Sequence, residues 1–297
     1  MHSILLALAI LGQAPEGDLT IKTGDLVATM SSKAAWTITS ITDGDDRLVL
    51  PMGGQGAVLS IRGDWIGSAM KEGSEPVASL TATADNQPVT LALPQTISGE
   101  KLTVAKASTL GPFKHTAETT FQKDTLVQHH SFEATDDGSV DHLYAFLYSM
   151  WPQAKHWLAQ PLTGELLRGE FAADKGTKPN RPMRWLAQYD PALQKGVVAC
   201  FREPLAGKGA YHGFWDTEGY HKLIARPACG VLVKGDKFDL TMAMRFFRAA
   251  PADWEKRAQA VAGELQQQVP PTAEPVGGQA PAAKLYVIPA GRLGGVV

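Results

Sequence analysis

Residues 34–61, AAWTITSITDGDDRLVLPMGGQGAVLSI, contain the pattern on which the fold prediction rests. Apolar and polar residues alternate, a turn follows at DGDD, a short run ends at Pro51, and a second run resumes after a Gly-rich loop. Alternation with a period of two is typical of a half-buried β-strand, and Gly, Asp and Pro mark turns between strands. The segment therefore predicts three consecutive strands joined by short connections.

The same pattern continues over most of residues 18–250. Runs such as LVATMSS, KLTVAKASTLG and FDLTMAMRFFRA are rich in Thr, Val, Leu and aromatic residues, and turn residues separate them. A spacing of about 8–12 residues between turns is typical of a sandwich or barrel. Because the strands are too many for a small sandwich, we predict an all-β fold, one large antiparallel sandwich of two big sheets.

One helix is predicted near the C-terminus, over residues 252–266. In PADWEKRAQAVAGELQQQ, Pro and Asp are typical of a helix start, and four apolar residues share one face: Trp254, Ala258, Val261 and Leu265. Residues 18–266 are therefore predicted to form a single domain that ends in this helix. Residues 267–297 are predicted to form a Pro/Gly/Ala-rich linker and an apolar tail too short to span a membrane.

The charge balance argues against a nucleic-acid ligand. The formal net charge is −2, with a pI near 6.4, and Lys and Arg are spread along the chain. Phosphate binding requires a basic face, and a membrane-surface patch requires a basic cluster. We therefore expect neither nucleic acid nor a stable membrane span.

The N-terminus favours export. Residues 4–11 form an unbroken apolar run, shorter than the roughly 20 residues that cross a bilayer. Such a run is typical of a secretory signal peptide, and we assign it to residues 1–14, with a secreted or periplasmic, cell-envelope location. The alternative is a buried first strand or helix, since no Lys or Arg precedes the run and Pro15 follows the cleavage position.

Two cysteines are present, Cys200 and Cys229, both in apolar segments. They form either a disulfide, which export would permit, or two buried free thiols. Their spacing is not that of a zinc site, and no Gly-rich phosphate loop precedes a helix. We expect no metal and no cofactor.

Three segments together resemble the galactose mutarotase-like family: residues 34–61, residues 120–148 and residues 184–201, within a resemblance that extends over about 18–250. The family contains aldose epimerases, glycoside hydrolases and polysaccharide lyase domains. The resemblance implies a β-supersandwich that holds a sugar or glycan on the concave face of a large sheet. It also implies a His acid and a Glu base if the protein is an epimerase. For a lyase it implies a Tyr or His base and a group that neutralises a uronate carboxylate.

The segment VDHLYAFLYSMWP contains a candidate binding stripe. As one continuous strand it places His142, Tyr144, Phe146 and Tyr148 on one face, where aromatic rings can stack on sugar rings. The alternative is a second core layer, because strands can be buried on both faces. We take His142 as a proton-transfer candidate, and Tyr144 and Tyr148 as substrate-binding candidates.

Two further segments contribute isolated candidates. In QHHSFEA, His129 alternates with polar residues and is preferred over His130, although a structural histidine remains the alternative. Arg184, at the end of the basic stretch GEFAADKGTKPNRPMRW, is expected to bind a carboxylate. Trp65 and Glu72, in a turn-rich segment, are candidates for the rim of the groove.

The segment YHGFWDTEGYHKLIARP, residues 211–227, predicts a hairpin dense in reactive side chains. Histidine suits proton transfer near neutral pH, Lys and Arg suit carboxylates, and Trp offers a stacking surface. The alternative is a hairpin with a solvated polar face. The candidates fall into two groups, for proton transfer His212, Tyr220 and His221, and for substrate binding Trp215, Lys222 and Arg226.

The sequence therefore indicates a carbohydrate as the partner and leaves two functions open. The first is an enzyme on an acidic glycan, a polysaccharide lyase or a glycoside hydrolase, that uses His/Tyr acid–base catalysis. The second is a non-catalytic carbohydrate-binding or structural envelope module on the same fold. The sugar, the bond and the oligomeric state stay open.

Overall fold

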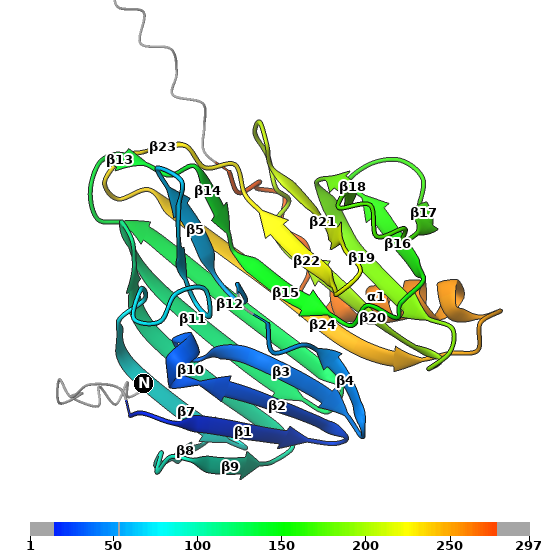
Figure 1. Cartoon of the computed structure of the whole chain (residues 1–297), viewed down its shortest axis with the longest axis horizontal. Coiled ribbons are helices and arrows are strands. Elements are labelled where there is room, and N and C mark those ends of the chain that lie inside the picture. Colours follow the sequence, from blue (N-terminus) through cyan, green and yellow to red (C-terminus); the bar gives the residue numbers. More distant parts are fainter. Residues whose placement is uncertain (1–14, 53, 278–297) are drawn as a thin grey trace, which may run out of the picture.

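The computed structural model describes residues 15–52 and 54–277, and most of its strands belong to two large sheets packed face to face (Figure 1). The predicted signal peptide, residues 1–14, and the tail from residue 278 lie outside the described residues. The predicted all-β class with one C-terminal helix is confirmed.

The first sheet has nine strands, of which the first three form part of the site described below. In spatial order they are β18 (Thr177–Arg181), β21 (Tyr211–Asp216), β22 (His221–Arg226), β15 (Phe146–Met150), β4 (Asp46–Val49), β3 (Thr37–Asp43), β2 (Leu26–Ser31), β1 (Asp18–Thr23) and β9 (Gln95–Ser98). Its pairs are antiparallel except β1 with β9, which is parallel.

The second sheet has ten strands and supplies the other half of the core. In spatial order they are β17 (Leu167–Glu170), β16 (His156–Pro161), β19 (Met183–Asp190), β20 (Lys195–Phe201), β24 (Lys237–Arg248), β12 (Thr125–Ala134), β11 (Phe113–Gln122), β10 (Lys101–Leu110), β7 (Val77–Ala84) and β8 (Gln87–Val89).

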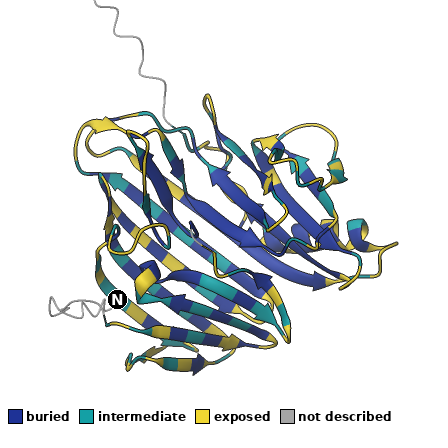
Figure 2. Cartoon of the chain, in the orientation of Figure 1, coloured by how far each residue is buried: buried dark blue, intermediate teal, exposed yellow. Residues whose placement is uncertain are grey.

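Smaller elements lie around the sandwich. A three-stranded sheet joins β14 (His142–Tyr144), β5 (Val58–Ile61) and β6 (Asp64–Gly67), and a two-stranded one joins β13 (Gly138–Ser139) and β23 (Val231–Leu232). A short 3₁₀ helix, η1 (Ser32–Ala34), follows β2. Figure 2 shows the buried residues concentrated along the middle of the large sheets.

Alternation builds the core between the sheets. Leu19, Ile21 and Ile38 from one sheet and Phe121, Phe132 and Leu186 from the other are fully buried in one apolar cluster. Burial of side chains of this size, at about 1.5–3 kcal/mol each, is the main stabilising contribution to such a fold.

The helix α1 (Trp254–Gln268) covers the outer face of the ten-stranded sheet over β19, β20 and β24. It begins and ends two residues later than the sequence predicts. The four apolar residues expected on one face, Trp254, Ala258, Val261 and Leu265, are all buried there. None of the helices in the described part of the chain is long and apolar enough to cross a membrane.

The structure shows that the two cysteines are unbonded and that the segment after the helix contacts the sandwich. Cys200 and Cys229 are both free thiols, and Cys200 lies buried under the helix, with its Sγ 3.7 Å from the Ala262 carbonyl oxygen. The segment predicted as a flexible linker returns over the sandwich, because Thr272 N donates to Arg202 O at 2.8 Å and Val276 N to Pro204 O at 2.9 Å.

The strand predicted over residues 142–148 is interrupted at Ala145. β14 pairs with β5, whereas β15 pairs with β22 in the nine-stranded sheet. Both Ala145 and Phe146 are buried in the core, so the alternation shifts by one residue between the two strands. The expected aromatic stripe is therefore divided: His142 and Tyr144 lie outside the sandwich, and Phe146 and Tyr148 lie inside it.

Candidate functional site

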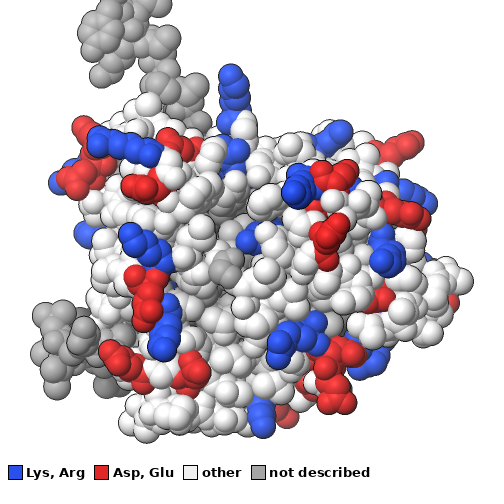
Figure 3. All heavy atoms as spheres, in the orientation of Figure 1, with Lys and Arg blue, Asp and Glu red and all other residues white. Residues whose placement is uncertain are grey.

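A hollow of about 550 Å³ lies on the outer face of the nine-stranded sheet, between the three-stranded sheet and the β21–β22 hairpin. Figure 3 shows this face hollowed near its centre, with basic and acidic side chains interspersed over it. The lining residues are Gly54, Val58, Trp65, Met70, Tyr144, Leu147, Lys175, Thr177, Tyr211, Trp215, Lys222 and Ile224. We call it the aromatic hollow.

Strand register explains why these side chains meet. Across β21 and β22, Trp215 is opposite Lys222 and Tyr211 is opposite Arg226. On β15, Leu147 is opposite Ile224. Since residues two apart on a strand share a face, the aromatic and basic side chains of the hairpin point away from the core and into the hollow.

Two tryptophans dominate the aromatic hollow. Trp65 stacks on Tyr144, with ring centroids 5.7 Å apart, and on His142, at 5.6 Å. Trp215 makes an edge contact with Tyr220 at 6.3 Å. Their exposed fractions are 37% and 38%, which is high for tryptophan in a folded chain. Exposed apolar surface of this kind commonly marks a binding site.

Tyr211 lies beside Tyr144 in the wall of the hollow. The Arg226 guanidinium lies over its ring, 5.7 Å from the centroid. Burial raises the pKa of Tyr211 well above its ordinary value, and the neighbouring Tyr144 raises it further. The Tyr211 hydroxyl is therefore protonated at neutral pH and can donate a hydrogen bond to a ligand.

Lys222 and Lys175 supply positive charge to the lining. Lys222 is mostly buried, and its Nζ lies over the Tyr220 ring, 4.9 Å from the centroid. Burial lowers the pKa of Lys222 from its ordinary value. None of the described residues that line the hollow is Asp or Glu. The lining therefore combines aromatic faces, hydroxyl donors and cations.

The aromatic hollow unites part of the predicted site. Tyr144, Trp215 and Lys222 line it, and Trp65, expected at a rim, forms part of its wall. The neighbouring candidates contact lining residues: His142 stacks on Trp65, Tyr220 contacts Trp215 and Lys222, and Arg226 contacts Tyr211.

The histidines of the hairpin point the other way. His212 is buried against Phe201, with ring centroids 3.8 Å apart, and its Nδ1 accepts a hydrogen bond from Met183 N at 2.9 Å. His221 stacks on Phe171 at 3.7 Å, with its Nε2 3.1 Å from the Pro152 carbonyl oxygen. The sequence groups both histidines with Lys222 as candidates of one hairpin site, and that grouping is wrong, because strand alternation places the histidines on the opposite face.

Three other candidates lie away from the aromatic hollow. Tyr148 is buried in the core and donates to Gln128 Oε1 at 2.5 Å. His129 is on the outer face of the ten-stranded sheet, with Nδ1 3.2 Å from Thr241 Oγ1. Arg184 is exposed, and its Nε donates to Leu162 O at 3.2 Å.

Sequence reasoning did not select Tyr211, Lys175 or Met70. Tyr211 shares a face with Trp215 by simple alternation, so the signal was present in the hairpin. Lys175 lies in the basic stretch from which only Arg184 was selected, and Met70 lies in the same turn-rich segment as Trp65 and Glu72. Their position beside the hairpin depends on long-range packing that no local pattern encodes.

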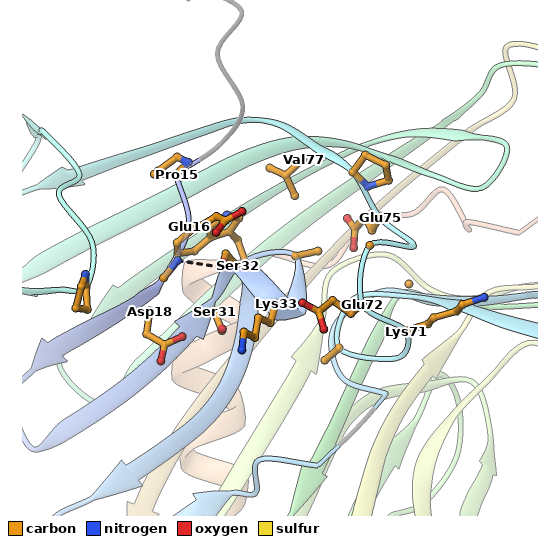
Figure 4. A pocket seen from close by; sticks show the side chains of 18 residues that line it. Pro15, Glu16, Asp18, Ser31, Ser32, Lys33, Lys71, Glu72, Glu75 and Val77 are labelled. Carbon is orange, nitrogen blue, oxygen red and sulfur yellow. Dashed lines mark hydrogen bonds between the residues drawn. The ribbon is translucent and has the colours of Figure 1, made fainter.

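A second hollow, of about 730 Å³, lies where η1 meets the β6–β7 loop (Figure 4). Figure 4 shows Lys33 and Lys71 among the acidic residues Glu16, Asp18, Glu72 and Glu75 around it. Gly17 N donates to Ser32 Oγ at 3.0 Å. Glu72, expected at the sugar-binding rim, lies here instead. Among the described residues that line this second hollow, the only aromatic one is Trp36, which is buried.

Glu75, in the wall of this second hollow, is engaged in a buried polar network. Its Oε1 accepts from Lys106 Nζ and Ser108 Oγ, each at 2.7 Å, and lies 2.7 Å from His115 Nδ1. Burial alone would raise the pKa of Glu75, but Lys106 and His115 outweigh it and hold the pKa well below the usual range. The carboxylate is thus already saturated by protein groups, which leaves the aromatic hollow as the better ligand site.

Neither the family models nor the curated proteins include a match to this chain. Solved structures do. One is an α-N-acetylgalactosaminidase from Bifidobacterium bifidum, with a TM-score of 0.51 and 11% identity, matched over 83% of this chain and 39% of that chain. An aldose epimerase homologue from C. elegans matches with a TM-score of 0.43 and 11% identity, over 79% of this chain and 99% of that chain. An α-galactosidase from Geobacillus stearothermophilus matches with a TM-score of 0.48 and 10% identity, over 78% of this chain and 41% of that chain.

The chain has the galactose mutarotase-like fold, as the sequence resemblance implies. At this level of identity the likeness concerns the fold. The chain spans about two fifths of the galactosaminidase.

Proposed function

We propose that this protein binds a carbohydrate in the aromatic hollow. One observation supports this most directly: Trp65 and Trp215, both more than a third exposed, line one hollow together with Lys222. Indole faces stack on the C–H faces of sugar rings, and Tyr hydroxyls supply hydrogen bonds. The volume lies within the range of about 300–1,000 Å³ that is typical of small-ligand sites.

The charges in the lining favour an acidic sugar. Lys175 and Lys222 line the hollow, the Arg226 guanidinium lies over the ring of Tyr211, and no described lining residue is acidic. A carboxylate or sulfate on the ligand gains charge-assisted hydrogen bonds there, which are about twice as strong as neutral ones. A neutral sugar gains only the stacking contacts.

Binding without catalysis is the form of this function with the best support. The resemblance implies a Glu base in epimerases, and glycoside hydrolysis uses a pair of carboxylates. None of the described lining residues provides either. Asp216, in the hairpin itself, is fully buried and does not line the hollow, so it does not provide a hydrolytic acid there.

A lyase is the second candidate, and His142 is the observation that favours it. Burial lowers the pKa of His142, so its imidazole is neutral at pH 7 and able to accept a proton. It stacks on Trp65 beside the hollow, and Arg226 and Lys222 would neutralise the uronate carboxylate. Tyr211 is a poor base in this reaction because its pKa is raised.

A panel of acidic and neutral oligosaccharides tests both candidates. Binding measured by calorimetry, with no change in ultraviolet absorbance or reducing ends, supports the binding module. Absorbance of unsaturated uronates that rises with reducing ends supports the lyase, and reducing ends alone indicate a hydrolase. Absence of binding to every sugar contradicts the proposal.

Export remains part of this proposal. A carbohydrate-binding protein of the cell envelope would lose residues 1–14 on secretion. N-terminal sequencing of protein recovered from cell fractions distinguishes a start at Pro15 from a start at Met1. Retention of Met1 in the cytoplasmic fraction contradicts export and leaves the binding proposal intact.

A further inference from the structure

One wall of the aromatic hollow is a loop, and a buried carboxylate holds it. The loop, residues 171–178, runs from the end of β17 into the first two residues of β18 and contributes Lys175 and Thr177 to the lining. Asp216 Oδ2 accepts from Ala172 N at 2.7 Å and from Ala173 N at 3.0 Å. The same oxygen accepts from Lys178 Nζ at 2.8 Å. The carboxylate therefore holds both ends of the loop at one point.

The backbone of Asp216 holds the middle of this loop. Asp216 N donates to Gly176 O at 2.9 Å, and Lys175 N donates to Asp216 O at 2.9 Å. The indole of Trp215 donates from Nε1 to Lys175 O at 3.0 Å. The stacking surface of Trp215 and the position of Lys175 are thus coupled to the residue that follows Trp215.

The electrostatics indicate a fixed assembly. Asp216 Oδ1 lies 3.1 Å from His221 Nδ1, and both side chains are buried. Burial opposes the charge on Lys178, but hydrogen bonds to Asp216 and Asp174 raise its pKa above the ordinary value. Removal of one partner of a buried charged pair leaves the other uncompensated, so the assembly resists rearrangement.

We propose that Asp216 is a positioning residue for the carbohydrate site: it fixes the 171–178 loop so that Trp215 and Lys175 are preorganised for the ligand. This inference rests on the proposed function. Asp216 has no access to the hollow and acts only through this wall. A wall that is already ordered loses less conformational entropy when the ligand binds than a mobile wall does. Small misplacements of the contact groups also weaken the interaction with the ligand.

The first test is Asp216→Asn, a change of nearly the same shape, measured by calorimetry with the best oligosaccharide of the panel. We expect affinity about tenfold weaker. The matched control is Asp174→Asn, because Asp174 also pairs with Lys178, at 3.0 Å, but its side chain is half exposed. It should change affinity less than about twofold, since exposed pairs contribute little. Unchanged affinity in Asp216→Asn overturns the proposal.

Double-mutant cycles separate positioning from general destabilisation. If Asp216 acts through its own wall, Asp216→Asn costs little more once Trp215→Ala is present, but costs about tenfold again beside Trp65→Ala. A purely structural role predicts the same added loss in both backgrounds, and that result overturns the proposal.

Hydrogen exchange tests the anchor without a ligand. In Asp216→Asn the amides of Ala172 and Ala173 should exchange at least about tenfold faster, while those of β24 keep their protection. If this variant does not fold, Lys178→Gln replaces it, because the hydrogen bonds from Ala172 N and Ala173 N to the Asp216 carboxylate remain. In Lys178→Gln we expect faster exchange at the same amides and a smaller loss of affinity than in Asp216→Asn. Unchanged exchange in the folded variant overturns the anchor. If the wild type binds no sugar, the proposed function fails. The hydrogen exchange of Ala172 and Ala173 then still tests whether Asp216 anchors the loop.

Discussion

Trp215 and Asp216 are neighbours in the chain, yet one is 38% exposed in the aromatic hollow and the other is fully buried behind it. Their strand, β21, presents alternate residues to opposite faces, so it delivers a stacking surface outward and an anchor inward. The hydrogen bond from Trp215 Nε1 to Lys175 O connects the two roles. The functional surface and its support are therefore specified within two residues.

Lys222→Met should separate acidic from neutral ligands. Methionine keeps most of the length and apolar contact but removes the charge, so we expect acidic oligosaccharides to bind about tenfold more weakly and neutral ones to change little. Calorimetry at two salt concentrations measures both. Lys237→Met, on the other large sheet with an exposed side chain, is the control. An equal loss of affinity for both ligand classes would show that Lys222 supports the fold of the site and does not discriminate acidic from neutral ligands.

Tyr148→Phe should cost stability and leave binding intact. Tyr148 is buried and donates to Gln128 Oε1, so its loss leaves a buried acceptor unpaired, at about 1–3 kcal/mol. Urea denaturation measures the free energy of unfolding. Tyr144→Phe, at a residue that lines the hollow, is the matched comparison and should weaken binding with a smaller loss of stability. A Tyr148→Phe protein with normal stability and weak binding would restore Tyr148 to the binding site.

Gly213→Ala should displace β18, the strand that continues from the loop wall. A Cβ at Gly213 would lie 2.2 Å from the Pro179 carbonyl oxygen, so β18 would have to move away from β21. We expect a lower melting temperature, by several degrees, and weaker sugar binding. Gly219→Ala, where nothing lies within 4 Å of the added Cβ, is the control and should preserve both. Equal melting temperatures for the two variants would contradict the close approach of the two strands.

The buried histidines should make the protein less stable in acid. Burial lowers the pKa of His212 to about 3, and it also lowers those of His115, His130 and His221. The folded pKa lies below the unfolded value near 6.5, so the unfolded chain binds more protons as the pH falls. Their contribution is complete above pH 6.5 and is lost progressively below it, for His212 down to about pH 3.

His212→Asn tests this dependence, because its oxygen can still accept from Met183 N. In that variant the fall of unfolding free energy between pH 6 and 4 should be shallower by up to about 1.4 kcal/mol per pH unit. Gly219→Ala, which removes no titratable group and has nothing within 4 Å of the added Cβ, should keep the wild-type slope. A His212→Asn slope equal to that of the wild type would show that the pKa of this histidine is the same in the folded and the unfolded protein, and would contradict the effect of burial.

The class of fold was predictable because local patterns encode it. Alternation and turn residues from Asp18 onward determine strands, and the helix face from Trp254 to Leu265 is a strong periodic signal. The faces of the hairpin also follow from alternation, and the error about His212 and His221 came from grouping residues by chemistry across both faces.

The break at Ala145 was not predictable from the pattern. Nothing in DHLYAFLYS distinguishes one strand from two, because the shift arises when β14 joins β5 and β15 joins β22. That single shift moves Tyr148 into the core and leaves Tyr144 outside. The pairing of Trp65 with Tyr144 has the same origin, since strands from distant parts of the sequence have to meet first.

The central claim is tested most directly by titrating wild type, Trp65→Ala and Trp215→Ala with the best acidic oligosaccharide, with melting temperatures in parallel. Both tryptophans are partly exposed, so stability should change little, whereas each variant should bind about ten- to a hundredfold more weakly, as expected for a central aromatic contact. Leu193→Ala, an exposed apolar residue elsewhere, should bind as the wild type does. Wild-type affinity in both tryptophan variants would contradict the account and place the sugar on another surface.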